Sequence, residues 1–382
     1  MTRSTVLTLR LAQFRSYAAA SIATGGASVA LHGPNGAGKT NLLEAVSMLS
    51  PGRGLRRAGA EDLARRGAPG WRIRAEVDTP AGPIEVVTGA APPDPARRTV
   101  EIDGKAAPQT RLAEQFGMIW LTPAMDRLWM EGAADRRGFL DRMTMGFTPS
   151  HAEAATGYEK AMRARNRLLR EPHWDDAWLG GIEAQMARLG ARIARARTAA
   201  LARLIAAQQG AQTLFPRADL SILGDMEIRF HQALVDGGDP DMIEIEEAAG
   251  LARALSQTRA RDAAAGRTLD GPHRSDLDAV YAAKAMPARA CSTGEQKALL
   301  ISVILGHARA LADATGAAPI LLLDEVAAHL DASRRRALYA EIGALGAQAW
   351  MTGTGPELFD GLEGARHVAV RETDGASALD AA

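Results

Sequence analysis

The sequence predicts an α/β protein in which a P-loop parallel sheet and an antiparallel β-subdomain carry an inserted helical lobe. Three observations lead to this prediction. A glycine-rich motif at 33–40 follows an apolar strand and precedes a helical pattern. A second apolar run, at 320–323, is typical of a central parallel strand and ends on two carboxylates. Between these motifs, long helical patterns run from about 133 to 265, which indicates that a large insertion splits the nucleotide fold.

Apolar spacing assigns the individual elements in chain order. Strands, with alternating or continuous apolar residues, are predicted at 6–11, 17–22, 28–32, 71–77, 84–87, 226–235, 320–323 and 348–352. Helices, with apolar residues three or four apart, are predicted at 42–49, 150–170, 182–209 and 298–305. We expect a polar tail after the last strand. The resulting domains are the N-terminal part of the head, the helical insertion lobe and the C-terminal part of the head, at 1–132, 133–265 and 266–382.

Composition excludes several classes of protein. The chain has 382 residues, and its 45 Lys and Arg balance its 45 Asp and Glu, which argues against a protein that coats DNA constitutively. With 47% hydrophobic and 24% charged residues, disorder is not the dominant state. The single cysteine, Cys291, excludes an internal disulfide framework and a cysteine-based zinc cluster. No apolar run approaches the ~20 residues that span a bilayer, and no signal-peptide core is seen, so we expect a cytoplasmic protein without a membrane partner.

The glycine-rich motif fits G-x-x-x-x-G-K-[ST] at every required position. Its glycines allow backbone N–H groups to point at a phosphate, and the helix that follows adds its N-terminal dipole. Lys39 is expected to reach the outer phosphates, and Thr40 to offer its hydroxyl to Mg²⁺. The predicted nucleotide-binding residues of the motif are Gly33, Pro34, Asn35, Gly36, Ala37, Gly38, Lys39 and Thr40.

Two carboxylates at the end of the apolar run predict the hydrolytic half of the site. Asp324 follows the strand directly and is expected to hold Mg²⁺ beside the phosphates. Glu325 is expected to orient or deprotonate the attacking water. Together with Lys39, these are the predicted catalytic residues. A pair of carboxylates that caps the next helix is the structural alternative.

A third motif, Ser292–Lys297, precedes an apolar helix. It places a serine, a glycine and helix N-terminal amides together, which suits an anion. Ser292 and Glu295 also form a capping-box pattern, and the two interpretations are compatible.

The order of these three motifs resembles the ABC-type ATPase heads. Within that class, several stretches are similar to the RecF family of bacterial DNA replication and repair proteins, in that family's order. They are 14–17, 38–45, 136–141, 158–161, 165–169, 271–277 and 292–297.

The resemblance implies a dimer that closes around ATP. Ser292 and Gly294 would contact the γ-phosphate bound by the partner copy, and Asp331 matches the family's D-loop. The implied protein binds gapped DNA or duplex–single-strand junctions and hydrolyses ATP slowly, with DNA stimulating the reaction. It works with RecO and RecR to load the RecA recombinase, with a role in the SOS response.

The resemblance also implies roles for residues around the nucleotide. Arg15 matches an arginine that reaches the nucleotide in related heads, although a surface turn residue is the alternative. Thr352 or Thr354 stands where other ABC ATPases carry a switch histidine. Two positions depart from the expected pattern. Ala124 replaces an acid, with Asp126 as a candidate substitute, and Thr293 stands where a glycine is common in the signature of ABC proteins.

Clusters of basic residues predict where DNA binds. Residues 160–203 hold ten basic and four acidic residues, and residues 53–74 hold seven arginines. Such stripes bind phosphates without reading sequence, although a solvated helix face is the alternative. Residues 236–247 hold six acids that offset the first cluster. The predicted DNA contacts are Arg163, Arg188, Arg192 and Arg195.

Three other functions remain open on the sequence alone: a transporter ATPase subunit, an SMC-like chromosome-organising ATPase, and a nucleotide-gated scaffold with negligible turnover. The length of the helical insertion and the basic clusters disfavour the first. The insertion is also too short for a long coiled coil, which disfavours the second.

Overall fold

The computed structural model describes residues 2–373 and 375–381. Two compact units make up the chain. The head unit is formed by residues up to Asp126, by Gly210–Pro216 and by residues from Leu300 onward. The helical unit is formed by Arg127–Gln209 and Arg217–Leu299.

These cuts differ from the expected domain bounds in two respects. Gly210–Pro216, expected in the helical lobe, groups with the head unit. The cut after Asp126 lies close to the expected boundary at 132, but residues 266–299 group with the helical unit. The reason is a strand pairing: β11 (Asp276–Tyr281) is antiparallel to β10 (Ala218–Leu223) over its whole length. Apolar spacing alone does not reveal such a long-range pairing.

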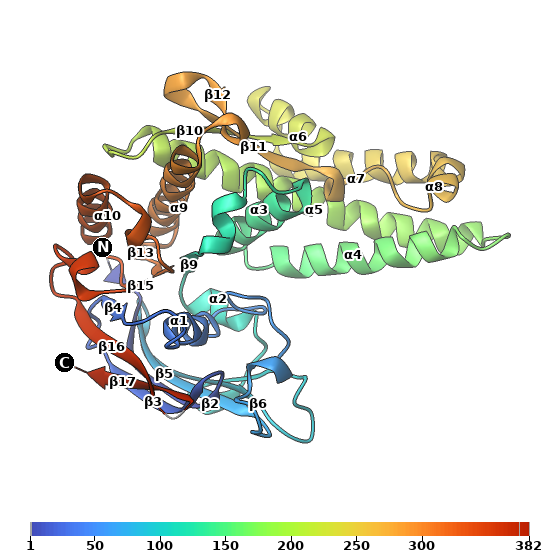
Figure 1. Ribbon diagram of the computed structural model, residues 1–382. Coiled ribbons are helices and arrows are strands. Elements are labelled where there is room, and N and C mark those ends of the chain that lie inside the picture. The colour runs from blue at the N-terminus through green and yellow to red at the C-terminus, as the bar shows by residue number, and fades with distance from the viewer. Residues whose placement is uncertain (1, 374, 382) are drawn as a thin grey trace. The chain divides into compact units, whose positions relative to one another are not determined.

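A mixed six-stranded sheet forms the nucleotide half of the head unit (Figure 1). All its neighbouring strands are parallel except β16 and β17, which form an antiparallel hairpin at one edge. In spatial order the strands are β17 (Ala376–Ala381), β16 (Arg366–Thr373), β4 (Val29–His32), β15 (Ala349–Gly353), β14 (Ile320–Leu323) and β9 (Met118–Leu121). The central strands are buried throughout, as their continuous apolar sequences require.

An antiparallel six-stranded sheet forms the other half of the head unit. Along β5, buried and exposed residues alternate, because one face packs on the core and the other meets solvent. In spatial order the strands are β3 (Tyr17–Ala23), β2 (Thr5–Phe14), β5 (Trp71–Thr79), β6 (Gly82–Ala90), β7 (Thr99–Ile102) and β8 (Lys105–Ala106).

Helix α1 (Lys39–Ser47) buries its apolar side in a core that both sheets share. Leu42 and Val46 of this helix lie in the same cluster as Phe14 of the antiparallel sheet and Trp350 of the parallel sheet. The remaining elements of the head unit are α2 (Arg111–Gln115), α10 (Ala332–Leu345) and the short pair β1 (Thr2–Arg3) and β13 (Ala317–Ala318).

Helix α9 (Thr293–Thr315) starts in the helical unit and continues into the head unit. By length and composition it could cross a membrane, but 78% of its most apolar window is buried inside the structure. Such burial shows that this part of α9 packs inside the protein core.

The helical unit is built mainly of long helices packed side by side. Helix α5 is the longest, with 34 residues, and its predicted apolar face, including Met186, Ile193 and Leu204, is buried. The elements are α3 (Ala133–Phe147), α4 (His151–Leu168), α5 (Asp176–Gln209), α6 (Asp225–Val235), α7 (Pro240–Gln257), α8 (Arg259–Ala265), and a small sheet of β10, β11 and β12 (Met286–Pro287).

Two predictions of secondary structure are wrong. The strand predicted at 226–235 is helix α6, whose buried Met226 and Phe230 are four residues apart; the strand of this region is β10. The predicted polar tail after 352 contains the hairpin β16–β17. Val368 and Val370 of β16 are fully buried in the head core, so this segment is part of the sheet.

Candidate functional site

The glycine-rich loop connects β4 to α1, as the motif predicts. Gly36 and Gly38 have φ values of +82° and +110°, which residues with a Cβ rarely adopt. At Gly33 the constraint is also one of space, because an added Cβ would lie 2.2 Å from the Val370 carbonyl oxygen. The loop thus needs glycine for its backbone shape and for its contact with β16.

Lys39, the first residue of α1, is folded back on the loop. Its Nζ donates hydrogen bonds of 2.8 Å to the carbonyl oxygens of Gly33 and Pro34. Burial lowers the pKa of its ammonium group, and the nearby carboxylates of Glu325 and Asp324 oppose this effect. A cation held among backbone carbonyls at a helix N-terminus is well placed to bind an arriving anion.

Asp324 lies beside Thr40 at the carboxyl edge of the parallel sheet. The Thr40 hydroxyl donates to Asp324 Oδ1 and Oδ2 at 3.0 and 3.2 Å, and the Thr352 hydroxyl donates to Oδ1 at 2.7 Å. Burial raises the pKa of Asp324, while the hydrogen bonds from Thr352 and Thr40 lower it. Three oxygen-bearing side chains from separate strands and a helix therefore meet at one point.

The backbone at Glu325 is unusual. Its φ is +53°, which is uncommon for a residue with a Cβ. Its N–H donates to the Thr352 hydroxyl at 2.8 Å, which ties the turn to β15. The half-buried side chain follows Asp324 directly, where a carboxylate can act as a general base.

Arg15 is engaged with helix α1 in this structure. Its Nε and Nη2 donate to the two carboxylate oxygens of Glu44, each at 2.8 Å, and its Nη1 donates to the carbonyl oxygen of Asp62 at 3.0 Å. Glu44 is fully buried, so this bidentate pair connects the β2–β3 turn to the helix that follows the phosphate loop.

Two residues that were not among the predicted site residues support the loop from behind: Tyr17 on β3 and Ser377 on β17. Both donate hydrogen bonds to carbonyl oxygens of the loop. One sequence pattern could have indicated that Ser377 lies on a strand. The apolar residues Val368-Ala369-Val370 are followed by an Asp-Gly dipeptide at 374–375, which is typical of a hairpin turn.

The Ser292 motif lies in the helical unit, where α9 begins. Glu295 Oε2 accepts hydrogen bonds of 2.8 Å from both the backbone N–H and the hydroxyl of Ser292, so the predicted capping box is present. Lys284 pairs with the same carboxylate, and the contacts from Lys284 and Ser292 lower the pKa of Glu295 to about 2. Gly294 has open space around its Cα, which leaves room for a ligand.

The remaining residues that the resemblance implies lie in the head unit, at a helix N-cap, in a 3₁₀ turn and at the end of β15. Asp331 is the N-cap of α10, and its Oδ1 accepts from the N–H groups of Ser333 and Arg334 at 2.9 Å. Ala124 is exposed and Asp126 half-buried in the 3₁₀ turn that follows β9. Of the two candidate switch residues, Thr352 contacts Asp324, whereas Thr354 is exposed.

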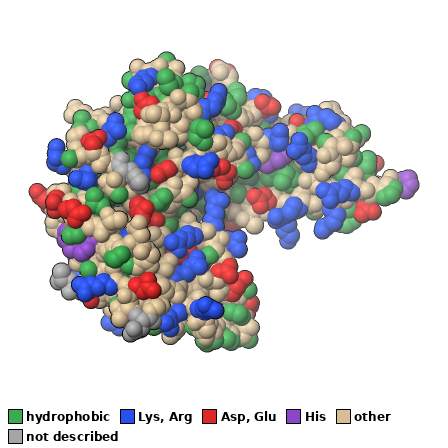
Figure 2. All heavy atoms as spheres, in the orientation of Figure 1, with side chains coloured by type: hydrophobic (Ala, Val, Ile, Leu, Met, Phe, Trp, Pro, Cys, Tyr) green, Lys and Arg blue, Asp and Glu red, His purple; other side chains and the backbone are tan. Residues whose placement is uncertain are grey.

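The four predicted DNA contacts lie on α4 and α5, and they are not equivalent. Arg163, Arg188 and Arg192 are exposed. Arg195 instead pairs with Asp241 and with Glu244 (at 2.9 Å), both on α7. In Figure 2, Lys and Arg side chains gather along the part of the surface that α4 occupies in Figure 1.

A groove of about 350 Å³ runs between α5 and the start of α4. Arg192, Arg195 and Arg203 line it, together with Glu244 and several small residues. Because Glu244 is already paired with Arg195, the uncompensated charge of this groove is positive. An anionic chain such as a phosphodiester backbone fits a groove of this character.

Two arginines of the basic cluster at 160–203 are buried and stabilise the helical unit. Arg165 pairs with Glu183 at 3.0 Å and with Asp262 at 2.7 Å. Arg197 pairs with Asp141 at 2.8 Å and with Glu227 at 2.9 Å. Removing one partner of such a buried pair costs about 3–5 kcal/mol, so these residues fasten α4 and α5 to their neighbours.

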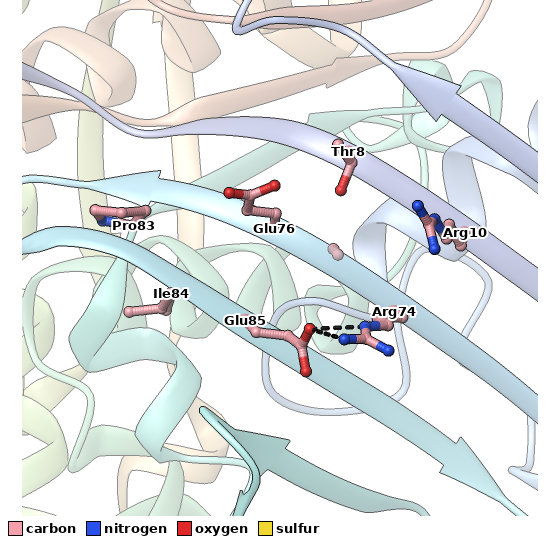
Figure 3. A pocket seen from close by; sticks show the side chains of 8 residues that line it. Thr8, Arg10, Arg74, Glu76, Pro83, Ile84 and Glu85 are labelled. Atoms are coloured by element: carbon pink, nitrogen blue, oxygen red, sulfur yellow. Dashed lines mark hydrogen bonds and ion pairs between the residues drawn. The ribbon is translucent and has the colours of Figure 1, made fainter.

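A separate hollow of about 420 Å³ lies on the exposed face of the antiparallel sheet (Figure 3). Arg10 and Arg74 are directly opposite each other on β2 and β5, and Glu76 and Glu85 are opposite each other on β5 and β6. Arg74 Nε donates to Glu85 Oε2 at 2.7 Å. Because the charges of the hollow balance, it favours neither an anion nor a cation.

Within the described residues, no cluster of three or more His, Cys, Asp or Glu side chains could hold a metal ion by itself. Thr40 and Asp324 nevertheless offer hard oxygen atoms at the edge of the phosphate loop. Mg²⁺ in phosphate sites is held by only one or two protein oxygens together with substrate phosphates and water. The residues present therefore fit Mg²⁺ that arrives with a nucleotide.

Comparison with known families agrees with this geometry. The model of the RecF/RecN/SMC N terminal domain matches residues 5–374. The DNA replication and repair protein RecF of Brucella suis biovar 1 is 50% identical over 367 residues, covering 95% of this chain and 93% of that protein. The protein of the same name from Mesorhizobium japonicum is 49% identical over 362 residues, covering 93% of each.

Solved structures show the same fold. The recombination mediator protein RecF-ATPrS of the RecFOR pathway has a TM-score of 0.84 at 21% identity, covering 100% of this chain and 99% of that one. An SMC head bound to the C-winged helix domain of ScpA has a TM-score of 0.53 at 14% identity, covering 99% and 97%. The predicted fold class, an ABC-type ATPase head with an inserted helical lobe, is therefore confirmed.

Proposed function

The chain belongs to the RecF family of DNA replication and repair proteins, and from this premise we propose that it is an ATP-dependent DNA-binding protein of recombinational repair and replication restart. The observation that carries this proposal is the meeting of Lys39, Thr40, Asp324 and Glu325 behind a phosphate loop, in a unit whose fold is that of ATPase heads. Transporter subunits and SMC proteins share parts of this machinery, but the identity to RecF proteins favours the repair function.

In the proposed mechanism, the loop from Gly33 to Gly38 binds the phosphates of ATP through its backbone N–H groups. Lys39 leaves its two carbonyl partners and moves toward the β- and γ-phosphates. Thr40 and Asp324 would hold Mg²⁺, which supplies charge neutralisation when bound. Glu325 orients a water molecule for attack on the γ-phosphate and accepts its proton.

We further propose that ATP joins two copies of the chain. Ser292 and Gly294 of one copy would contact the γ-phosphate held by the other, with Asp331 close to the same junction. In the single chain, the Ser292 hydroxyl donates a hydrogen bond to the Glu295 carboxylate. In the dimer, this hydroxyl would turn from the carboxylate to the phosphate. Arg15, now paired with Glu44, would reach the nucleotide only by giving up part of that pair.

DNA contact is proposed for the helical unit. The exposed Arg163, Arg188 and Arg192 would neutralise phosphates without reading bases, and Arg195 would contribute less because two acids hold it. Slow, DNA-stimulated hydrolysis would reopen the dimer. Partners implied by the family are RecO and RecR, which assist loading of RecA at gaps and junctions during the SOS response, in the cytoplasm.

Light scattering tests the proposal directly. The expected result is a monomer alone and a dimer with ATP, which gains further mass when duplex DNA is added. Lys39→Ala should remain a monomer under all conditions, because it removes the charge that binds the outer phosphates. ATP-dependent dimers of Lys39→Ala on DNA would contradict the assignment of the nucleotide site.

A further inference from the structure

The carbonyl oxygens of a phosphate-binding loop need partners as much as its N–H groups do. When the N–H groups of such a loop converge on a phosphate, its carbonyl groups turn toward the protein, where a buried acceptor without a donor is costly. In this chain, the carbonyls of Gly33 and Pro34 accept from Lys39, whereas those of Ala37 and Gly38 accept from side chains outside the loop. Backbone N–H groups add two contacts, from Ala37 to the Pro34 oxygen at 3.3 Å and from Leu42 of α1 to the Gly38 oxygen at 3.1 Å. The hydrogen bonds from Lys39 and those from outside the loop respond differently when a nucleotide binds.

The Lys39 contacts come from a group that is itself proposed to bind a phosphate. Nζ has three N–H donors and uses two of them on the Gly33 and Pro34 oxygens, so these two hydrogen bonds weaken or shift when Nζ also binds a phosphate. The contacts from outside the loop do not compete with the phosphate. They are the ones that can persist through binding.

Ser377 provides the first of these contacts. Its hydroxyl donates to the Ala37 carbonyl oxygen at 2.6 Å and lies 2.7 Å from the Ser16 hydroxyl. Its backbone N–H donates to the Ser16 carbonyl oxygen at 3.0 Å, which fixes β17 beside the β2–β3 turn. The approach is close: a Cβ on Gly38 would lie 2.2 Å from Ser377 Oγ. Gly38 is therefore required by the strand behind the loop as well as by the loop's own backbone.

Tyr17 provides the second contact. It is fully buried, and its hydroxyl donates to the Gly38 carbonyl oxygen at 3.0 Å. Burial raises the pKa of this phenol well above its usual range, so it stays protonated and remains a donor. Its partner oxygen belongs to the peptide group that joins Gly38 to Lys39, at the start of α1.

We propose that Tyr17 and Ser377 are positioning residues that fix the peptide groups after Ala37 and Gly38, and thereby set the affinity of the loop for the phosphate chain of a nucleotide. Neither residue touches the nucleotide. Each acts by keeping the loop in its binding shape, because loops that spend time in other shapes bind more weakly in proportion. The inference rests on the proposed nucleotide site and goes beyond the motif itself.

Two variants test this inference. Tyr17→Phe and Ser377→Ala each remove one donor, and Tyr17→Phe keeps the ring that fills the core. We expect each to raise the Kd for ATP about fivefold, the factor given by the loss of one hydrogen bond. The Kd for inorganic tripolyphosphate, measured by displacement of a fluorescent ATP analogue, should rise by the same factor, because the nucleotide base is not involved. Turnover at saturating ATP should stay at the wild-type value, so the effect lies in KM and not in kcat.

Tyr339→Phe is the matched control. Tyr339 is also a buried tyrosine of the head unit whose hydroxyl donates to a backbone carbonyl, that of Leu358, but Leu358 is not part of the phosphate loop. We expect Tyr339→Phe and Tyr17→Phe to lower the Tm by similar amounts, while Tyr339→Phe keeps the wild-type Kd for ATP.

Each possible outcome points to a different explanation. Wild-type ATP affinity in both Tyr17→Phe and Ser377→Ala, with a lowered Tm, would overturn the inference, because the two contacts would then be structural only. An equal rise in Kd for Tyr339→Phe would overturn it as well, since general loosening of the head would explain all three variants. A wild-type protein that does not bind ATP would instead overturn the proposed function, and this inference with it.

Discussion

The Thr352 hydroxyl donates a 2.7 Å hydrogen bond to Asp324 Oδ1, and through this contact the carboxyl ends of two neighbouring parallel strands share one site. The same hydroxyl oxygen accepts the N–H of Glu325 at 2.8 Å. Thr352 therefore orients the carboxylate expected to bind Mg²⁺ and holds the left-handed backbone of the residue expected to activate water.

Replacing Thr352 by valine should slow ATP hydrolysis about tenfold, with a smaller change in ATP affinity. Valine keeps the shape of the side chain but leaves the Glu325 N–H unpaired and removes a donor from Asp324; losses of one or two such contacts amount to about 1–2 kcal/mol. Phosphate release at saturating ATP, alongside equilibrium nucleotide binding, measures both quantities. Turnover equal to that of the wild type would show that Thr352 has no part in the reaction.

Glu325→Gln should retain ATP binding but lose hydrolysis, by a factor of about a hundred or more, because an amide cannot accept a proton from water. If hydrolysis reopens the dimer, the variant should stay on duplex DNA longer than the wild type. Dissociation of a labelled duplex in the presence of ATP measures this residence time. An unchanged residence time would favour the alternative of a scaffold with negligible turnover.

The double variant Arg188→Ala/Arg192→Ala should bind DNA more weakly, equally for all sequences. Loss of two phosphate contacts should also reduce the slope of log Kd against log salt concentration by about two. Arg195→Ala should have a smaller effect, since Asp241 and Glu244 already neutralise this residue. Arg229→Ala, which loses an exposed arginine paired with Glu247 on another helix, is the control and should bind DNA normally.

Asp141→Asn should destabilise the helical unit in a pH-dependent way. Burial alone would raise the pKa of Asp141, but the contacts with His151 and Arg197 outweigh it and lower the pKa to about 2. A depressed carboxylate pKa contributes stability that is fully present above the unfolded-state value near 4 and is lost as the pH falls toward 2.

Urea unfolding of wild type and Asp141→Asn measures that contribution. The difference in the free energy of unfolding should be about 2 kcal/mol at pH 7 and should shrink between pH 4 and pH 2. A constant difference across this range would mean that Asp141 contributes by packing and not by its charge.

The sequence was sufficient for those parts of the site that are local in the chain. The phosphate loop, Asp324 and Glu325 are recognised by short motifs because each motif carries its own backbone requirement, such as the positive φ at Gly36 and Gly38. The capping of Ser292 by Glu295 follows the same rule, since both partners lie within one helical turn.

Contacts between distant segments could not be predicted in this way. Nothing near Ser377 reveals that it donates to Ala37, and nothing near Arg165 or Arg197 reveals that acids from other helices surround them. Counting Arg165 and Arg197 as surface charge overstated the positive field of residues 160–203. Exposure of a single arginine depends on which helix packs against it, and periodicity does not specify that neighbour.

The position of β4 within its sheet has a consequence for synthesis of the chain. This strand ends at His32, yet its two neighbours are β15 and β16, which end at Gly353 and Thr373. A ribosome that adds about 5–20 residues per second needs roughly 20–70 s to pass from the end of β4 to the end of β16. During that time β4 lacks both of its neighbours in the sheet. Most of the helical unit, by contrast, is contiguous in sequence and has left the ribosome earlier, so the nucleotide site is the last part of the molecule to be completed.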